Sequence, residues 1–539
     1  MSVSDTYAAR LATNSDDDFD DGSPLCSVMF SAATLVVVLV VFKVIYERWV
    51  TPLAKVPGPF LHSVTSIPMR VNMLRGRMPD FCEALHRRYG PVVRISPQRV
   101  SFSDAAVVKQ VLATHAFVKP GAYEVPKAVE PNTFSTQSPE VNTERRRQVG
   151  PGFSHRHLHQ MEGSILQCGV VGVQRRLDAM LAAAAEQQEP KAAGGRAVVV
   201  QYYQWFSLVT LDTIGLLGFG RKFHALERGG HELVPALNWL RTFNYVTMAL
   251  PWLKRVPLFV SRRVPWVRLL LGFSQSAIDE RRQRAPDPDA APDLLQLILD
   301  PDSDGGSKLT DAQMVSETLL HLIAGVDTTT AGLTWTLALL LHNPHIMERL
   351  TTDIRREFPD RAVPIDYDAC RQRLPYLAAV ISESLRVLSP APSILPRVAP
   401  TGGVRMAGYY LPAGTWLCCP LGAVHKNPAT FRAPLAFDPE RFMGDGDEKH
   451  SLLAFSTGVR ACLGRNLALL EMNVVLANLL RSYDLRLPEN AVAADCVAPQ
   501  GSEKSAAGVV PDIPRWTMLT LNPIYPDRDC LVVVSPASE

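Results

Sequence analysis

The stretch Phe455-Ser456-Thr457-Gly458-Val459-Arg460-Ala461-Cys462-Leu463-Gly464 carries the strongest signal in the chain. Its glycines let a loop turn tightly and present backbone N–H groups to the sulfur of Cys462. A cysteine that ligates iron binds as the thiolate, so its site needs such donors and a positive potential. The helix predicted after Cys462 adds the positive end of its dipole, and Arg460 adds a cation suited to a carboxylate. We therefore predict a metal-ligating cysteine, with a buried structural cysteine as the alternative.

The other eight cysteines are scattered, and none of the nine forms a Cys-x-x-Cys pair. An odd, scattered set in a chain of 539 residues fits neither a disulfide framework nor a zinc site, and it favours a reducing compartment.

Lys and Arg number 55 against 53 Asp and Glu, and the net charge of +2 gives no reason to expect nucleic acid as a partner. Length alone suggests three or four domains at ~150 residues each. No convincing linker or repeat divides the chain after Phe60.

A second signal lies in the longest helical pattern, 311–342, which begins with the capping box Thr310-Asp311-Ala312-Gln313 and ends before an Asn-Pro pair. Its centre is Ala324-Gly325-Val326-Asp327-Thr328-Thr329-Thr330. A glycine and three β-branched threonines propagate a helix poorly, and the aspartate interrupts an apolar run. Because the flanking residues are too apolar for an exposed helix, we expect Asp327 and Thr328 to face an interior cavity.

The N-terminus predicts a membrane anchor. Residues 1–21 form a polar, acidic tail, and the 21 uncharged residues 22–42 would span ~32 Å as a helix, which matches a bilayer core of ~30 Å. A cleaved signal peptide and a buried core helix are the alternatives, but the leader is acidic and charges flank both ends of the span. Basic residues follow the span in a basic, proline-rich hinge, 43–59, so we expect a single-pass protein whose bulk is cytoplasmic.

The remaining 480 residues are expected to form one mainly α-helical body, 60–539, with minor β-sheet. Helical spacing of apolar residues dominates, as in 199–217, 264–284 and 461–483. The brief strand-like runs are 92–95, 100–102, 517–521 and 531–534.

At the cysteine stretch the chain resembles the cytochrome P-450 superfamily, the haem-thiolate monooxygenases, whose pattern Phe-x-x-Gly-x-Arg-x-Cys-x-Gly it matches in full. The centre of the long helix is similar to the family's oxygen-activation segment. Glu383-Ser384-Leu385-Arg386 is similar to its Glu-x-x-Arg pair, and 437–442 is similar to the segment that completes a structural triad through Arg441. The resemblance implies a single large helical fold with minor sheets and an anchor of the microsomal, fungal type. It also implies that Glu383, Arg386 and Arg441 lock the cysteine loop and do not touch substrate.

The resemblance further implies haem b, ligated by Cys462. Arg397 is similar to one propionate ligand of the family, and Arg146 fits the early helix that reaches the other propionate. Arg145 and Arg147 are the alternatives to Arg146. Four residues before Arg146 the family usually has Trp or His, whereas this chain has Asn142, a departure that bears on the second propionate contact. The other implied haem-binding residues are Phe455, Gly458, Arg460 and Gly464.

In a monooxygenase of this type, Thr328 is expected to hydrogen-bond dioxygen and Asp327 to relay protons. Because only 77 residues follow Cys462 and no Gly-x-Gly-x-x-Gly follows a strand, we expect electrons from a separate NADPH-cytochrome P-450 reductase, with cytochrome b5 as a further donor. The implied location is the endoplasmic reticulum membrane. A haem isomerase or dehydratase of the same fold and a non-catalytic haem protein are the alternatives, the latter with His321 as the nearest candidate for a second axial ligand.

The expected substrate pocket lies between the long helix and the segment before Arg397, with 243–252 as a cover for the entrance. These segments offer no charged partner, so an apolar substrate such as a terpenoid, steroid, polyketide or fatty-acyl compound is favoured. Resemblance to fungal members suggests secondary-metabolite biosynthesis. The expected pocket residues are Leu320, Ala324, Ser393, Ile394 and Leu395.

Overall fold

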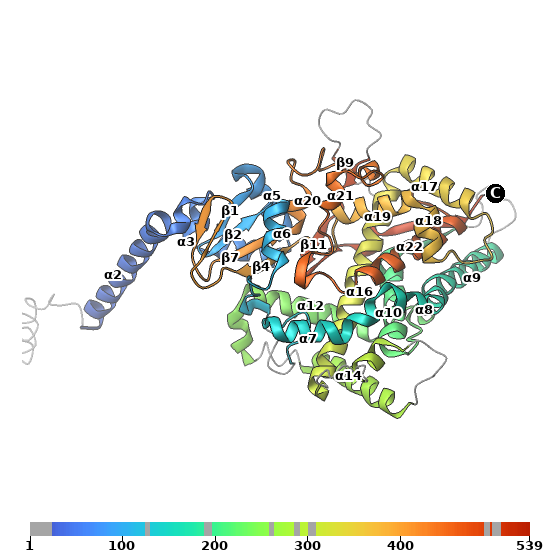
Figure 1. The fold of residues 1–539 in the computed structure, drawn as a ribbon, viewed down its shortest axis with the longest axis horizontal. Helices are drawn as coiled ribbons and strands as arrows, with labels where there is room; N and C mark the ends of the chain where they lie inside the picture. Colours follow the sequence, from blue (N-terminus) through green and yellow to red (C-terminus); the bar gives the residue numbers. More distant parts are fainter. Residues whose placement is uncertain are drawn as a thin grey trace, which may run out of the picture.

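A computed structural model describes residues 24–123, 130–187, 197–257, 264–284, 292–299, 309–489, 496–497 and 508–538. The acidic tail expected at 1–21 lies outside these residues. The described body is mainly helical with small sheets, as the sequence predicts (Figure 1). The described helices of eight or more residues are α2 (Pro24–Ile45), α4 (Ile67–Leu74), α5 (Met78–Tyr89), α6 (Ala105–Ala113), α7 (Pro139–Val149), α8 (His155–Ile165), α9 (Gly172–Gln187), α10 (Tyr202–Phe219), α12 (Leu233–Ala249), α14 (Val264–Gln283), α16 (Asp311–Leu341), α17 (Pro344–Glu357), α19 (Pro375–Val387) and α22 (Arg465–Ser482).

The largest described sheet has four strands in the order β1-β2-β7-β4, and it lies beside α5 and α6 (Figure 1). Its β2–β7 pair is parallel and its other pairs are antiparallel. A second sheet has the order β3-β13-β8 and is antiparallel throughout. The strands of these two sheets are β1 (Val92–Ser96), β2 (Arg99–Phe102), β3 (Val198–Gln201), β4 (Ile394–Val398), β7 (Trp416–Pro420), β8 (Tyr483–Arg486) and β13 (Leu531–Pro536). The remaining described strands form the pairs β5 (Val404–Met406) with β6 (Tyr409–Leu411), β9 (Cys496–Val497) with β10 (Val510–Pro511), and β11 (Arg515–Met518) with β12 (Thr520–Pro523).

Two boundaries predicted from periodicity have the wrong type of element, and the helix expected at 461–483 begins only at Arg465, after the cysteine loop. The expected helix 199–217 begins instead with β3, because three consecutive valines pair with β13, and α10 starts only at Tyr202. The expected strand 517–521 is a hairpin of β11 and β12 that turns at Leu519, whose φ is 71°. The valines of β3 come directly before α10, so they read as the start of that helix. The residues 517–521 on both sides of the turn read as the middle of one strand.

The apolar N-terminal helix α2 projects from the body (Figure 1). Within Val28–Val50, an 18-residue window has a mean hydropathy of 2.6 and none of it is buried, so this segment is long and apolar enough to cross a membrane. Helical structure continues past the expected end at residue 42, through Ile45 into a π-helical turn, Tyr46–Val50. Further along, Leu53 and Val56 are buried in a core shared with β2 and α6. The segment 43–59 therefore packs on the body as well as leading to it.

Arg94 on β1 connects the base of the anchor to the sheet. The side chain is 2% exposed, and its guanidinium donates to the backbone O and to Oε2 of Glu47, each at 2.6 Å. It also donates to the carbonyl of Pro97. Because this arginine is buried and several of its donors are engaged, it fixes the direction in which the chain leaves the anchor.

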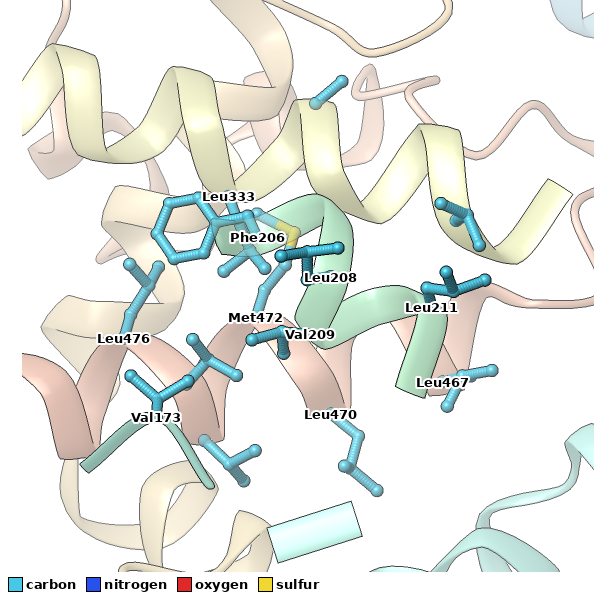
Figure 2. Close-up of a cluster of buried hydrophobic side chains, with 14 of the residues drawn as sticks. Val173, Phe206, Leu208, Val209, Leu211, Leu333, Leu467, Leu470, Met472 and Leu476 are labelled. Carbon is cyan, nitrogen blue, oxygen red and sulfur yellow. The ribbon is translucent and has the colours of Figure 1, made fainter. Parts of the chain in front are cut away.

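Three helices, α10, α16 and α22, cross at the centre of the main core (Figure 2). Leu208, Leu211 and Leu333 are buried there with Met472 and Leu476. This packing explains the glycine in the middle of α16. A Cβ on Gly325 would meet the Ile214 side chain of α10 at 2.9 Å, so the close crossing of the two helices requires the smallest residue.

The three consecutive threonines of α16 make three different contacts. Thr328 donates to Ala324 O of its own helix at 2.7 Å. Thr329 lies on another side of the helix, where it hydrogen-bonds the buried Glu471 of α22. Thr330 Oγ1 lies 2.8 Å from Thr210 Oγ1 of α10. The poor helix-forming residues therefore serve separate contacts around α16, and two of the three join it to neighbouring helices.

Candidate haem-thiolate site

The cysteine loop forms a tight turn that ends at the start of α22. Cys462 N donates to Phe455 O at 2.9 Å, and a 3₁₀ turn, Gly458–Arg460, lies between them. Gly458 has φ 71°, and a Cβ there would meet Leu112 O at 2.3 Å. This position therefore requires glycine both for its left-handed backbone and for its approach to α6. Gly464 caps α22, and its backbone N–H hydrogen-bonds the sulfur of Cys462.

Cys462 is the only exposed cysteine among the seven whose side chains the structure describes. Protein atoms nevertheless surround the thiol closely enough to raise its pKa by burial. The Cys462 side chain is therefore accessible to solvent although protein atoms surround it on most sides. The Gly464 N–H and the cations Arg146 and Arg465 act in the opposite direction and lower the pKa, as a thiolate ligand requires. Bound metal favours the same deprotonated form.

Three arginines from separate elements gather beside the cysteine loop. Arg146 of α7 donates to Ala461 O at 2.8 Å, and Arg460 donates to Thr136 O at 3.0 Å. Arg397 lies on β4 and is 3% exposed. Burial, followed by repulsion from Arg397 and Arg146, lowers the pKa of Arg460 to about 10. Within the described part of the chain, no carboxylate lies within salt-bridge distance of these three cations.

This donor set fits haem. An accessible thiol can serve as the thiolate ligand of the iron, and the group of cations beside it matches the two propionate carboxylates of a haem. The structure also distinguishes the three consecutive arginines of α7. Arg145 is buried, with Nε 3.8 Å from Glu317 of α16, and Arg147 is exposed, whereas Arg146 reaches the cysteine loop. Asn142 is fully buried, and its amide donates to Thr133 O at 2.9 Å.

On α16, one stripe of residues remains accessible to solvent. Leu320 and Thr328 are half-exposed and Ala324 is exposed, although the helix runs through the centre of the body. Their spacing of four residues places them on one side of the helix. The other expected pocket residues, Ser393, Ile394 and Leu395, are half-buried at the start of β4. Within 243–252, Phe243 is buried on α12, and Trp252 is exposed beyond its end.

Asp327 is held by an arginine that the sequence does not single out. Arg241 Nη1 of α12 lies 3.3 Å from Asp327 Oδ2, and both side chains are largely buried. Burial raises the pKa of Asp327, and the charge and hydrogen bond of Arg241 act against that rise. Arg241 Nη2 also donates to Asn238 Oδ1 at 3.0 Å. The aspartate is therefore a largely buried ionisable group, and the cation of Arg241 opposes the effect of burial on its charge.

The predicted triad is fully buried behind the cysteine loop. Arg386 Nε and Nη2 each donate to Glu383 at 2.7 Å, a bidentate pair on α19. Arg441 Nε lies 3.4 Å from Glu383 Oε2, and its Nη1 bonds Glu448 at 2.7 Å. Arg386 also donates to His425 O at 2.8 Å. Glu383 thus contacts both arginines, as the motif predicts, and Arg441 also forms an ion pair with Glu448.

His425 connects the triad to the cysteine loop. It is fully buried, and its Nε2 accepts the backbone N–H of Leu453 at 2.9 Å, two residues before Phe455. Burial and the neighbouring Arg386 lower the pKa of His425 to about 3, so the ring is neutral and can accept this hydrogen bond. Sequence reasoning missed His425 because this residue lies outside the motifs that contain the triad and the cysteine loop.

The fold and this cysteine loop are those of a haem-thiolate protein. The family model for cytochrome P-450 matches residues 56–498, most of the chain, so the chain belongs to the cytochrome P-450 family. It is 30% identical to cytochrome P-450 monooxygenase helB1 of Aspergillus fumigatus over 516 residues, 94% of this chain and 86% of helB1. It is 31% identical to helB3 of the same fungus, over 95% of this chain and 98% of helB3. It is also 31% identical to the monooxygenase traB of Penicillium crustosum, over 87% and 93% of the two chains. The chain is a fungal-type haem-thiolate monooxygenase, an oxidoreductase.

Proposed function

We propose that Cys462 would ligate the iron of a haem b and that this chain inserts one oxygen atom of dioxygen into an apolar compound of fungal secondary metabolism. The observation that carries the proposal is the exposed Cys462 sulfur beside three arginines that face no protein carboxylate within the described residues. A bound haem supplies dioxygen activation, and its thiolate ligand favours O–O cleavage.

The protein supplies ligation, orientation and protons. Arg146, Arg397 and Arg460 hold the propionates, while Phe455, Gly458 and Gly464 shape the loop that presents the sulfur. Gly464 N–H and the start of α22 stabilise the thiolate. Glu383, Arg386 and Arg441 lock the loop from behind.

Proton delivery is assigned to α16. Thr328 Oγ1, which donates to Ala324 O, could turn its hydroxyl to donate a hydrogen bond to the dioxygen that a bound haem would activate. Asp327 carries protons toward that hydroxyl, and its burial makes a neutral, proton-donating carboxyl accessible at higher pH than in water. Arg241 is a positioning residue because it acts through Asp327.

The substrate is proposed to be apolar, because Leu320, Ala324, Ile394 and Leu395 offer no charge, and Ser393 adds one hydroxyl. Electrons are proposed to come from a membrane-bound NADPH-cytochrome P-450 reductase, with cytochrome b5 as a further donor. The apolar span of α2 and the basic residues that follow it favour a single-pass anchor in the endoplasmic reticulum with a cytoplasmic body.

The test is metabolite profiling of a fungal host that expresses the full chain with its reductase under ¹⁸O-labelled dioxygen. The proposal predicts a new apolar product that contains one labelled oxygen atom and depends on NADPH. A Cys462→Ser strain is the matched control and should lack the product. A product without label that also forms without NADPH would contradict the proposal and indicate a haem isomerase or dehydratase.

A further inference from the structure

Lys119 is a buried lysine surrounded by other cations. Its side chain is 6% exposed, and its Nζ donates to Phe134 O at 2.5 Å. The ammonium also lies over the rings of Tyr123 and Phe134, 4.5 and 4.4 Å from their centroids. Burial and then Arg397, Arg460 and Arg146 lower its pKa well below the usual range. A buried ammonium ordinarily has an anionic partner, and among the described residues no carboxylate takes that role.

Backbone contacts place Lys119 next to Arg397, one of the three arginines near the cysteine loop. Val118 forms an antiparallel bridge with Val398, and Val398 N donates to Val118 O at 2.9 Å, so Lys119 follows directly where the chain passes Arg397. Tyr123 hydrogen-bonds the side chain of Arg397.

The segment 134–138 joins the same group of cations from the other side. Lys119 binds Phe134 O, and Arg460 binds Thr136 O. Two residues of chain span ~7 Å at most, so the two cations bind neighbouring carbonyls. Hydrogen bonds and a strand bridge thus place Lys119 close to Arg460 and Arg397. The same closeness explains why these arginines lower the pKa of Lys119.

Asn142 does not supply a further donor on this side. Its amide nitrogen is bound to Thr133 O, and the side chain is fully enclosed. A further cation beside Arg146, Arg397 and Arg460 comes instead from Lys119, in the segment after α6.

We propose that Lys119, supported by Tyr123, binds a haem propionate and makes the contact that Asn142 does not make. The inference rests on the proposed haem site. Two propionates bring two negative charges to a group of four cations, of which Lys119 and Arg397 are buried, and so provide the missing anionic partner. The contrasting possibility is that Lys119 serves only to pack between the rings of Tyr123 and Phe134.

The experiment measures the rate at which the purified full-length holoprotein loses haem to excess apomyoglobin. The variants are Lys119→Met, which keeps length and removes charge, and Lys119→Arg, which keeps charge. Lys109→Met on α6 is the matched control, because it removes a lysine outside this group of cations. Glu124→Gln is measured alongside, since Glu124 lies outside the described residues and is the nearest carboxylate in sequence.

We expect Lys119→Met to lose haem about tenfold faster than the wild type, the effect of one charge-assisted hydrogen bond. Lys119→Arg, Lys109→Met and Glu124→Gln should stay within about threefold of the wild type. The ferric/ferrous reduction potential of Lys119→Met should also fall, because a positive charge near the iron favours the reduced state.

Three results would overturn the inference. Equal haem loss from Lys119→Met and Lys119→Arg would mean that packing between the rings is what matters. Equal loss from Glu124→Gln would identify a protein carboxylate as the partner. Wild-type haem retention in Lys119→Met, whether or not its potential shifts, would exclude a binding contribution. Each of these leaves a cysteine-ligated haem in the wild type, whereas a wild type without haem would instead refute the proposed function. If Lys119→Met does not accumulate as holoprotein, haem retention by Lys119→Gln decides in its place.

Discussion

Arg241 and Asp327 form an ion pair across the contact between α12 and α16, with Nη1 and Oδ2 3.3 Å apart. The pair joins a helix that flanks the expected pocket to the centre of the helix that carries Thr328. Arg241 is the charged group that opposes the effect of burial on Asp327, so this contact sets how readily the carboxyl holds a proton.

Replacing Arg241 should shift the pH dependence of turnover. In Arg241→Met the pKa of Asp327 should rise further above its ordinary value, because burial then acts unopposed. Proton donation requires the protonated carboxyl, so the alkaline limb of the kcat profile should move to higher pH. Asp327→Asn is the control and should remove that limb. A limb that stays in place, or moves to lower pH, would contradict the role assigned to the pair.

Replacing Thr328 should separate NADPH consumption from product formation. Thr328→Ala removes the hydroxyl proposed to bind dioxygen, so product per NADPH should fall by about 10²-fold, with electrons recovered as hydrogen peroxide. Peroxide yield and product are measured in the same reaction. Thr330→Ala is the matched control, since Thr330 is buried and its hydroxyl contacts Thr210 of α10. It should keep normal coupling and lose about 1 kcal/mol of stability. Equal coupling in the two variants would count against a catalytic Thr328.

The buried carboxyl of Glu471 should make stability depend on pH. Burial raises its pKa to about 8, whereas an unfolded glutamate titrates near 4.3. The folded state therefore holds a proton that the unfolded state releases, and stability present below about pH 4.3 is lost as pH rises through about 8. Glu471→Gln removes this loss, so its advantage in thermal midpoint over the wild type should grow from about pH 5 to about pH 8. Exposed Glu348→Gln on α17 is the control. A difference that does not vary with pH would show that Glu471 does not titrate in this range.

Gly458 should tolerate no side chain. Gly458→Ala combines a left-handed backbone with a contact at 2.3 Å to Leu112 O, and we expect a cost of at least about 3 kcal/mol and loss of most bound haem. Gly444→Ala is the control, because a Cβ there meets nothing within 4 Å. Haem per protein chain and thermal midpoint measure the effect. Comparable haem content in the two alanine variants would mean that the loop can move away from α6.

The elements that could be predicted from the sequence are those whose signal is local. The capping box predicts the start of α16 at Asp311, and the turn at Gly458 follows from residues adjacent in the chain. The contacts that could not be predicted join distant segments. Arg241 is 86 residues from Asp327, and on α12 it reads as one polar residue of an amphipathic helix. His425 likewise gains its meaning only from Leu453, which the fold brings to it.

The group of cations beside the cysteine loop could likewise be predicted only in part. Arg146, Arg397 and Arg460 could be named from the family resemblance, but Lys119 carries no motif, and its place among them depends on the bridge between Val118 and Val398. Conversely, the valines of β3 gave a helical pattern because their strand partners lie some 330 residues away, on β13.

The central claim is that Cys462 ligates the iron as a thiolate, and the reduced carbon monoxide difference spectrum of the full-length protein tests it most directly. The wild type should show the red-shifted Soret band that is typical of thiolate-ligated haem. Cys168→Ser, at a half-buried cysteine away from the loop, should keep the band in full. Cys462→Ser should lose it, and a Cys462→Ser protein that retains both the band and full turnover would contradict the account.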